Sequence, residues 1–126
     1  FINNKKLLGN YKKILLLFLD NDDRKLKICN NVLSFKYSLI DEYSRTIPHS
    51  QIISSSELKK TIRESSQFDI LYPGVGENLS YLQKLKFNSE PNYICNENDI
   101  FCWKYAKKGF FNFKKNIPTI IDKIIP

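Results

Sequence analysis

Two short and almost entirely apolar runs constrain the fold most strongly. Ile14 to Leu19 holds no charge, and Phe68 to Tyr72 holds a single one, at Asp69. Strands that are buried on both faces of a parallel sheet have this character, whereas half-exposed strands alternate apolar and polar residues. Each run ends in a turn and is followed by apolar residues at helical spacing. The two runs therefore predict strand–turn–helix units in a covered sheet.

The same pattern recurs along the chain. Three further strands are predicted at Gln51–Ser54, Pro91–Cys95 and Phe110–Phe113. Helical spacing follows each strand and predicts helices over Ile28–Tyr43, Ser55–Ser66, Glu77–Lys86, Asn98–Lys108 and Asn116–Ile124, with Pro118 in the first turn of the last one. Strict alternation with short links predicts an α/β fold, namely a flavodoxin-like five-stranded parallel sheet of order 2-1-3-4-5 with helices on both faces.

The length of 126 residues is enough for one domain with a core of its own. Residues 1–10 are expected to be a basic lead-in, and residues 11–126 a single α/β domain. The chain contains no Met and starts at Phe1, so we expect it to be a segment of a larger protein.

Charge and cysteine usage narrow the setting. The formal net charge is +7, from 20 Lys and Arg against 13 Asp and Glu. This balance favours acidic partners, although excess lysine is also usual for solvated surface. The three cysteines, Cys29, Cys95 and Cys102, lie in regular apolar segments, which indicates reduced thiols in the cytoplasm rather than a disulfide framework. The longest apolar run is far shorter than the about 20 residues of a spanning helix, so no membrane insertion is expected.

Four segments, taken together, resemble a response-regulator receiver domain over about Lys12 to Ile125. Their order and spacing carry the resemblance, and the last of them is the most specific. They are the acidic turn Asp20-Asn21-Asp22-Asp23, the strand Gln67–Leu71, the helix Glu77–Lys86, and Lys104–Lys115, which is similar to the family's "A-x-x-x-G-A-F-N-F-I-x-K-P" segment.

The departures from the family pattern bear on function. Gly74 falls where the resemblance places the phospho-accepting Asp, and Asn96 falls where a Ser or Thr is expected. Lys115 is the lysine nearest to the family's Lys-Pro pair. Phosphotransfer needs an acceptor carboxylate, a metal and a cation held together. The resemblance therefore implies a degenerate pseudo-receiver that has no enzymatic activity and no cofactor.

Two remnants of a receiver site are candidates. Asp20, Asp22 and Asp23 would form a vestigial acidic pocket, with magnesium as a candidate ligand of Asp22 and Asp23. The alternative is a helix cap in a solvated turn, which the missing acceptor favours. Lys115 would be a vestigial phosphate-reading lysine, or simply a solvated loop lysine.

A basic face is the stronger candidate for a partner site. It consists of Lys104, Lys107, Lys108, Lys114 and Lys115, with no acidic residue between Ile100 and Ile121. Aromatic residues are interleaved with these lysines, as in some nucleic-acid-binding surfaces. The alternative is a set of core aromatics beneath a solvated basic surface.

One turn of the chain is similar to a turn found in a class of enzymes. Tyr72–Gly76 resembles the "LPGVG" turn of class I glutamine amidotransferases, which would make Cys95 a nucleophile and His49 its base. The glycine-flanked elbow of that family is absent, and His49 precedes the cysteine. A small buried hydrophobe is the simpler role for Cys95.

The sequence thus favours a non-enzymatic pseudo-receiver that acts as a protein–protein interaction or regulatory module in signalling. A nucleic-acid-associated or assembly subunit that uses the Lys104–Lys115 face is the alternative, and an active phospho-receiver is the third hypothesis.

Incubation with a small-molecule phosphodonor and Mg²⁺ tests the missing acceptor. We expect no base-labile mass increase in the intact chain. A stoichiometric adduct on Asp20, Asp22, Asp23 or Asp69 would place an acceptor that the pattern does not reveal.

Overall fold

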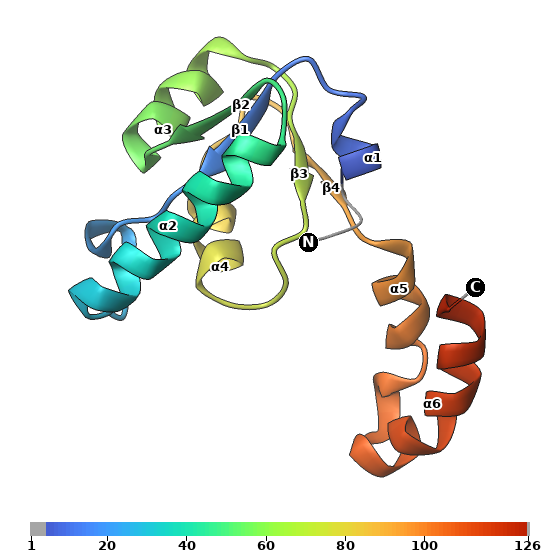
Figure 1. Cartoon of the computed structure of the whole chain (residues 1–126). Coiled ribbons are helices and arrows are strands. Elements are labelled where there is room, and N and C mark those ends of the chain that lie inside the picture. Colours follow the sequence, from blue (N-terminus) through green and yellow to red (C-terminus); the bar gives the residue numbers. More distant parts are fainter. Residues whose placement is uncertain (1–4, 126) are drawn as a thin grey trace. The chain divides into compact units, whose positions relative to one another are not determined.

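The computed structural model describes residues 5–125, apart from the side chains of Lys5, Lys6 and Lys108. In chain order the elements are α1 (Lys5–Leu8), β1 (Ile14–Leu17), the 3₁₀ helix η1 (Asn21–Asp23), α2 (Asn30–Thr46), β2 (Ser50–Ile53), α3 (Ser55–Glu64), β3 (Asp69–Leu71), α4 (Glu77–Lys84), β4 (Asn92–Ile94), α5 (Glu97–Trp103), the 3₁₀ helix η2 (Ala106–Lys108) and α6 (Phe110–Ile124) (Figure 1). The chain divides into two compact units. The first unit holds the residues up to Phe68 together with Pro73–Pro91, and the second unit holds Asp69–Tyr72 and the residues from Asn92 onward.

The first unit is built on the parallel pair β1–β2. Its register runs from Ile14 opposite Ser50 to Leu17 opposite Ile53. The Ile14 N–H donates to the His49 carbonyl at 3.1 Å, and the Phe18 N–H donates to the Ile53 carbonyl at 3.0 Å, so the ladder extends past both strand ends. Helix α2 connects the two strands and packs against β2 (Figure 1).

Most of the described core belongs to this unit. Its buried apolar residues come from α1, from β1 and β2 with their flanking loops, and from α3 and α4. They are Leu8, Ile14, Leu19, Ile47, Ile53, Leu58, Ile62 and Leu82. Leu58 and Ile62 are one helical turn apart on α3, so one stripe of this otherwise polar helix enters the core.

Helix α3 begins with a capping box. The Ser54 hydroxyl accepts from the Glu57 N–H, and the Glu57 carboxylate accepts from the Ser54 N–H at 2.7 Å. The backbone hydrogen bond from Ser54 holds the pKa of Glu57 below its ordinary value. Two amide donors that the helix leaves free are thereby satisfied. The predicted start of a helix after Ser54 is confirmed.

The second unit is built on the parallel pair β3–β4. Asp69 lies opposite Asn92, and Leu71 lies opposite Ile94. Edge-to-face ring contacts join Tyr72 to Tyr93 and to Trp103 at 6.4 and 5.9 Å, so aromatic packing links the strands to α5. Helices α5 and α6 form a hairpin through η2 (Figure 1).

The predicted five-stranded sheet is wrong. The described residues form two two-stranded parallel sheets, in which only the β1–β2 and β3–β4 neighbours of the predicted order are paired. The predicted fifth strand, Phe110–Phe113, is the first turn of α6. Gly109 has φ 84, a left-handed value that favours glycine, and it separates η2 from α6.

The reason lies in the spacing of apolar residues downstream. Phe110, Phe113, Ile117, Ile120 and Ile124 recur at helical intervals, which makes the aromatic run part of one amphipathic helix. Pro118 consequently lies inside α6 rather than in its first turn. Among the described residues, no helix is both long enough and apolar enough to cross a membrane.

Removal of the α3 cap tests the local account of this helix. Ser54→Ala should lower the free energy of unfolding by about 1 kcal/mol, because the Glu57 N–H loses its acceptor. Ser38→Ala is the matched control, since Ser38 lies within α2 and its hydroxyl donates only to the Ser34 carbonyl. Urea denaturation followed by circular dichroism gives both values. Equal stability of the Ser54 and Ser38 variants would mean that the capping box does not stabilise α3.

Candidate functional site

The acidic turn lies at the carboxyl end of β1. The Asp20 carboxylate accepts the Asn21 N–H at 2.6 Å and caps the 3₁₀ helix η1. Asp22 is exposed and Asp23 is half-buried. The cap by Asp20 agrees with the alternative that the turn caps a helix, although the capped helix is η1 and the long helix α2 begins later, at Asn30, without a side-chain cap. Within residues 5–125, no three acidic, histidine or cysteine side chains gather to hold a metal.

An ion pair ties this turn to the start of α4. Arg24 Nη1 donates to Glu77 Oε2 at 2.9 Å, and Arg24 Nη2 donates to the Leu19 carbonyl at 3.2 Å. Glu77 Oε1 accepts the Leu26 N–H at 3.2 Å. The Arg24 side chain is only 7 % exposed. The pKa of Glu77 lies below its ordinary value, mainly because its carboxylate accepts the Leu26 N–H. Partial burial opposes this shift, and the hydrogen bond and positive charge of Arg24 reinforce it.

No local pattern in the sequence indicates this pair, because Arg24 and Glu77 are 53 residues apart. Each residue alone has the ordinary features of a surface charge. Arg24 and Glu77 meet because, within the first unit, the residues after β1 lie close to the start of α4.

A polar cavity of about 170 Å³ lies beside this ion pair. It is lined by Arg24, Lys36 and the residues from Pro73 to Asn78. Gly74 and Gly76 have φ values of 77 and 142, so the loop needs glycine at both positions. The lining holds no hydroxyl, thiol or imidazole nucleophile, and Glu77 already compensates the charge of Arg24.

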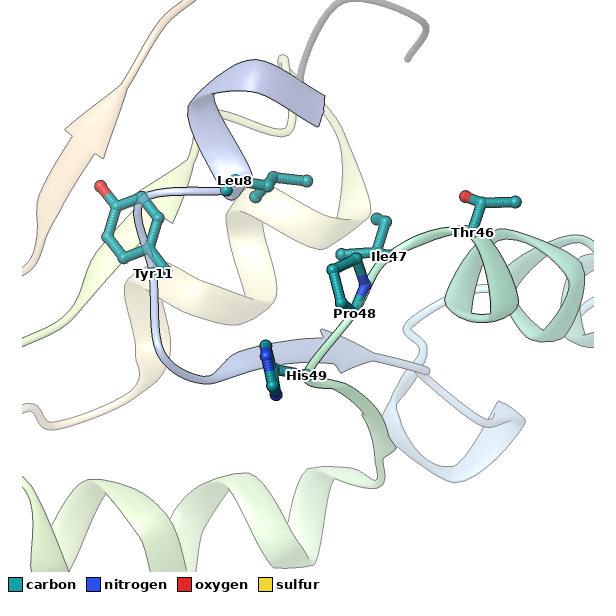
Figure 2. Close-up of a pocket in the computed structure, with 7 residues that line it drawn as sticks. Leu8, Tyr11, Thr46, Ile47, Pro48 and His49 are labelled. Carbon is teal, nitrogen blue, oxygen red and sulfur yellow. The ribbon is translucent and has the colours of Figure 1, made fainter.

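A second, mainly apolar cavity of about 140 Å³ lies near α1 (Figure 2). Its lining residues are Leu8, Gly9, Tyr11, Thr46, Ile47, Pro48 and His49. His49 has φ 62, an uncommon value for a residue other than glycine, and its carbonyl accepts the Ile14 N–H. The geometry of His49 therefore serves the start of the β1–β2 ladder.

The cysteines are all free thiols. Cys29 is exposed at the start of α2, while Cys95 and Cys102 are half-buried. Cys95 and His49 fall in different units of the chain. Their proposed pairing as nucleophile and base stays an untested prediction.

The predicted basic face lies on the helical part of the second unit. Lys104 follows α5, Lys107 belongs to η2, and Lys114 and Lys115 belong to α6; these four are exposed. The side chain of Lys108 lies outside the described residues. Lys104 Nζ and Lys123 Nζ stand 5.8 and 5.2 Å from the centre of the Phe101 ring. These cation–π contacts hold two positively charged groups against the ring of Phe101, which belongs to α5.

Large apolar side chains near these lysines are exposed. Trp103, Phe110 and Phe111, which are interleaved with the lysines, therefore do not fit the alternative of core aromatics beneath a basic surface. Phe110 and Phe111 are 68 and 78 % exposed, and their rings contact each other edge to face at 5.7 Å. Ile100, Trp103, Ile121 and Ile125 are exposed as well. Phe110 and Phe111 thus form an exposed aromatic pair close in sequence to the basic face.

Comparisons of the chain with protein-family models, curated proteins and solved structures found no match. The resemblance to receivers thus stays a prediction from sequence. Its most specific segment, Lys104–Lys115, spans η2 and the first turns of α6.

The Arg24–Glu77 pair predicts a pH-dependent stability. The folded-state pKa of Glu77 lies below its ordinary value of 4.5, so its stabilising effect is present above that value and disappears as pH falls through the folded-state pKa. Glu77→Gln should lower the free energy of unfolding at pH 7, because Arg24 stays buried without a counter-charge. The difference from wild type should shrink as pH falls below 4.5.

Asp41→Asn is the matched control for that experiment. Asp41 pairs with Arg45 at 2.7 Å on the exposed side of α2. Exposed pairs one helical turn apart contribute about 0.5 kcal/mol or less. Thermal denaturation across the pH series separates the two variants. An unchanged stability of Glu77→Gln at pH 7 would contradict the role given to the Arg24–Glu77 pair.

Proposed function

We propose that the chain is a non-enzymatic binding module that engages an acidic protein partner through the helical hairpin of its second unit. The observation that carries this proposal is the exposure of Phe110 and Phe111 next to Lys107, Lys114 and Lys115. Protein interfaces have aromatic residues at their centre and charged residues at their rim. The lysines supply the rim of such an interface.

The charges specify the sign of the partner. From Lys104 to Lys115 the chain carries five lysines and no acidic residue. Like charges close together on helices repel by a few tenths of a kcal/mol per pair. An acidic surface relieves this repulsion and also steers the partner during diffusion.

The apolar residues favour a protein over a nucleic acid. Bases stack on aromatic rings, and Phe110, Phe111 and Trp103 could serve in that way. The exposed aliphatic side chains of Ile121 and Ile125 offer no stacking surface. They match the apolar centre of a protein interface, and this difference supports a protein partner.

Binding to two probes of the same charge sign tests the proposal. One probe is an acidic peptide of Glu and Leu in mixed order, and the other is a DNA duplex. We expect the peptide to bind at physiological salt. Lys107→Glu combined with Lys115→Glu should weaken peptide binding by about tenfold, mainly through a slower association rate. Surface plasmon resonance at several salt concentrations measures both rates.

The matched control is Lys59→Glu combined with Lys60→Glu, which makes the same charge change on the exposed side of α3 in the first unit. This control should bind within about twofold of wild type. Tighter binding to the duplex than to the peptide, with affinity falling steeply in log salt, would support the nucleic-acid alternative instead.

A further inference from the structure

Helix α6 has a wider apolar face than its own unit covers. Its buried or half-buried apolar side chains are Phe113, Ile117, Ile120 and Ile124. Beside them, Phe110, Ile121 and Ile125 are 68, 46 and 62 % exposed. These three residues are separated by eleven and four positions, which are close to whole numbers of helical turns. Phe110 and Ile121 lie on one exposed line along α6, and Ile125 follows the helix as its C-cap, where its N–H donates to the Ile121 carbonyl at 2.9 Å. We call these three residues the α6 stripe.

Lys114 lies within the α6 stripe. It follows Phe110 by four residues and precedes Ile121 by seven, so it stands on the same line. An apolar partner covering this line would bury the ammonium group without a counter-charge, which is strongly unfavourable. A carboxylate of the occupant that pairs with Lys114 removes this cost and fits the positive charge of the hairpin.

The form of the α6 stripe indicates what kind of segment covers it. The stripe presents side chains of a helix whose backbone groups are already bonded within the helix, so an added strand would find no backbone partners there. Side-chain ridges of one helix pack into the grooves of another. The 15 residues of α6 extend about 22 Å, which matches four turns of a partner helix.

We infer that the α6 stripe is the docking site of an amphipathic helix from an acidic partner, with a carboxylate of that helix paired to Lys114. This inference rests on the proposed function and specifies the shape of the partner. Leu or Ile residues of the partner helix contact Phe110, Ile121 and Ile125. Acidic residues along its flanks face Lys107 and Lys115.

The test compares two peptides of identical composition, each of about 18 residues so that a helix covers α6. In the amphipathic peptide the Leu residues occupy one helical face, with Glu on both flanks and one Glu in the centre. In the mixed peptide the same residues are spread around the helix. We expect the full chain to bind the amphipathic peptide about tenfold more tightly, measured by fluorescence anisotropy.

Variants then locate the contact. Phe110→Ala combined with Ile121→Ala should weaken binding of the amphipathic peptide by about tenfold. Phe35→Ala, which truncates an equally exposed aromatic on α2, is the matched control and should bind as wild type does. Because all three residues are exposed, the substitutions should leave the fold intact, and circular dichroism of each variant checks this.

A charge exchange identifies the Lys114 contact. Lys114→Glu should weaken binding of the amphipathic peptide, and a peptide whose central Glu is replaced by Lys should bind this variant better than it binds wild type. Failure of that exchange would overturn the assignment of Lys114.

The remaining outcomes separate the inference from the proposed function. Equal affinity for the two peptides would overturn the helical occupant while the acidic protein partner stands. Failure of both peptides to bind would overturn both. Dimerisation of the chain that the Phe110 and Ile121 substitutions abolish would assign the α6 stripe to a second copy and overturn the inference.

Discussion

Parallel pairing of β1 with β2 is the constraint on which the first unit depends. Two parallel neighbours cannot be joined by a tight turn, so the chain must cross back over the sheet, and α2 makes this crossover. The carboxyl ends of both strands consequently meet at one edge. The acidic turn after β1 and the Ser54 cap after β2 both lie at that edge.

The two apolar runs Ile14–Leu19 and Phe68–Tyr72 predicted where β1 and β3 form but not how many strands pair. Helices beginning after Ser54 and at Glu77 were also predictable, because caps and glycine turns are local signals. Phe110–Phe113 failed because aromatic residues favour strands on average, while the periodicity that extends to Ile124 favours a helix. A pattern over fifteen residues outweighs the propensity of four.

The candidate sites divide in the same way. The exposure of Lys104, Lys107, Lys114 and Lys115 follows from charge alone and was predictable. The Arg24–Glu77 pair depends on a contact across 53 residues, which a single sequence does not encode in any local pattern. The acidic turn is evident from its composition, yet the Asp20 carboxylate accepts the N–H of the next residue, as short polar side chains commonly do in turns.

The distribution of the core gives the strongest reason to assign binding to the second unit. Among the described residues nine apolar side chains are buried, and only Ile120 belongs to that unit. A unit with so little buried area gains little hydrophobic stabilisation on its own. Its parallel strands are three residues long, and the contacts between its elements include ring pairs and cation–π interactions. Covering Phe110, Ile121 and Ile125 would add apolar burial where the unit most lacks it. The contacts that form the interface would therefore also stabilise α6. The stability of this hairpin would then depend on whether the partner is bound.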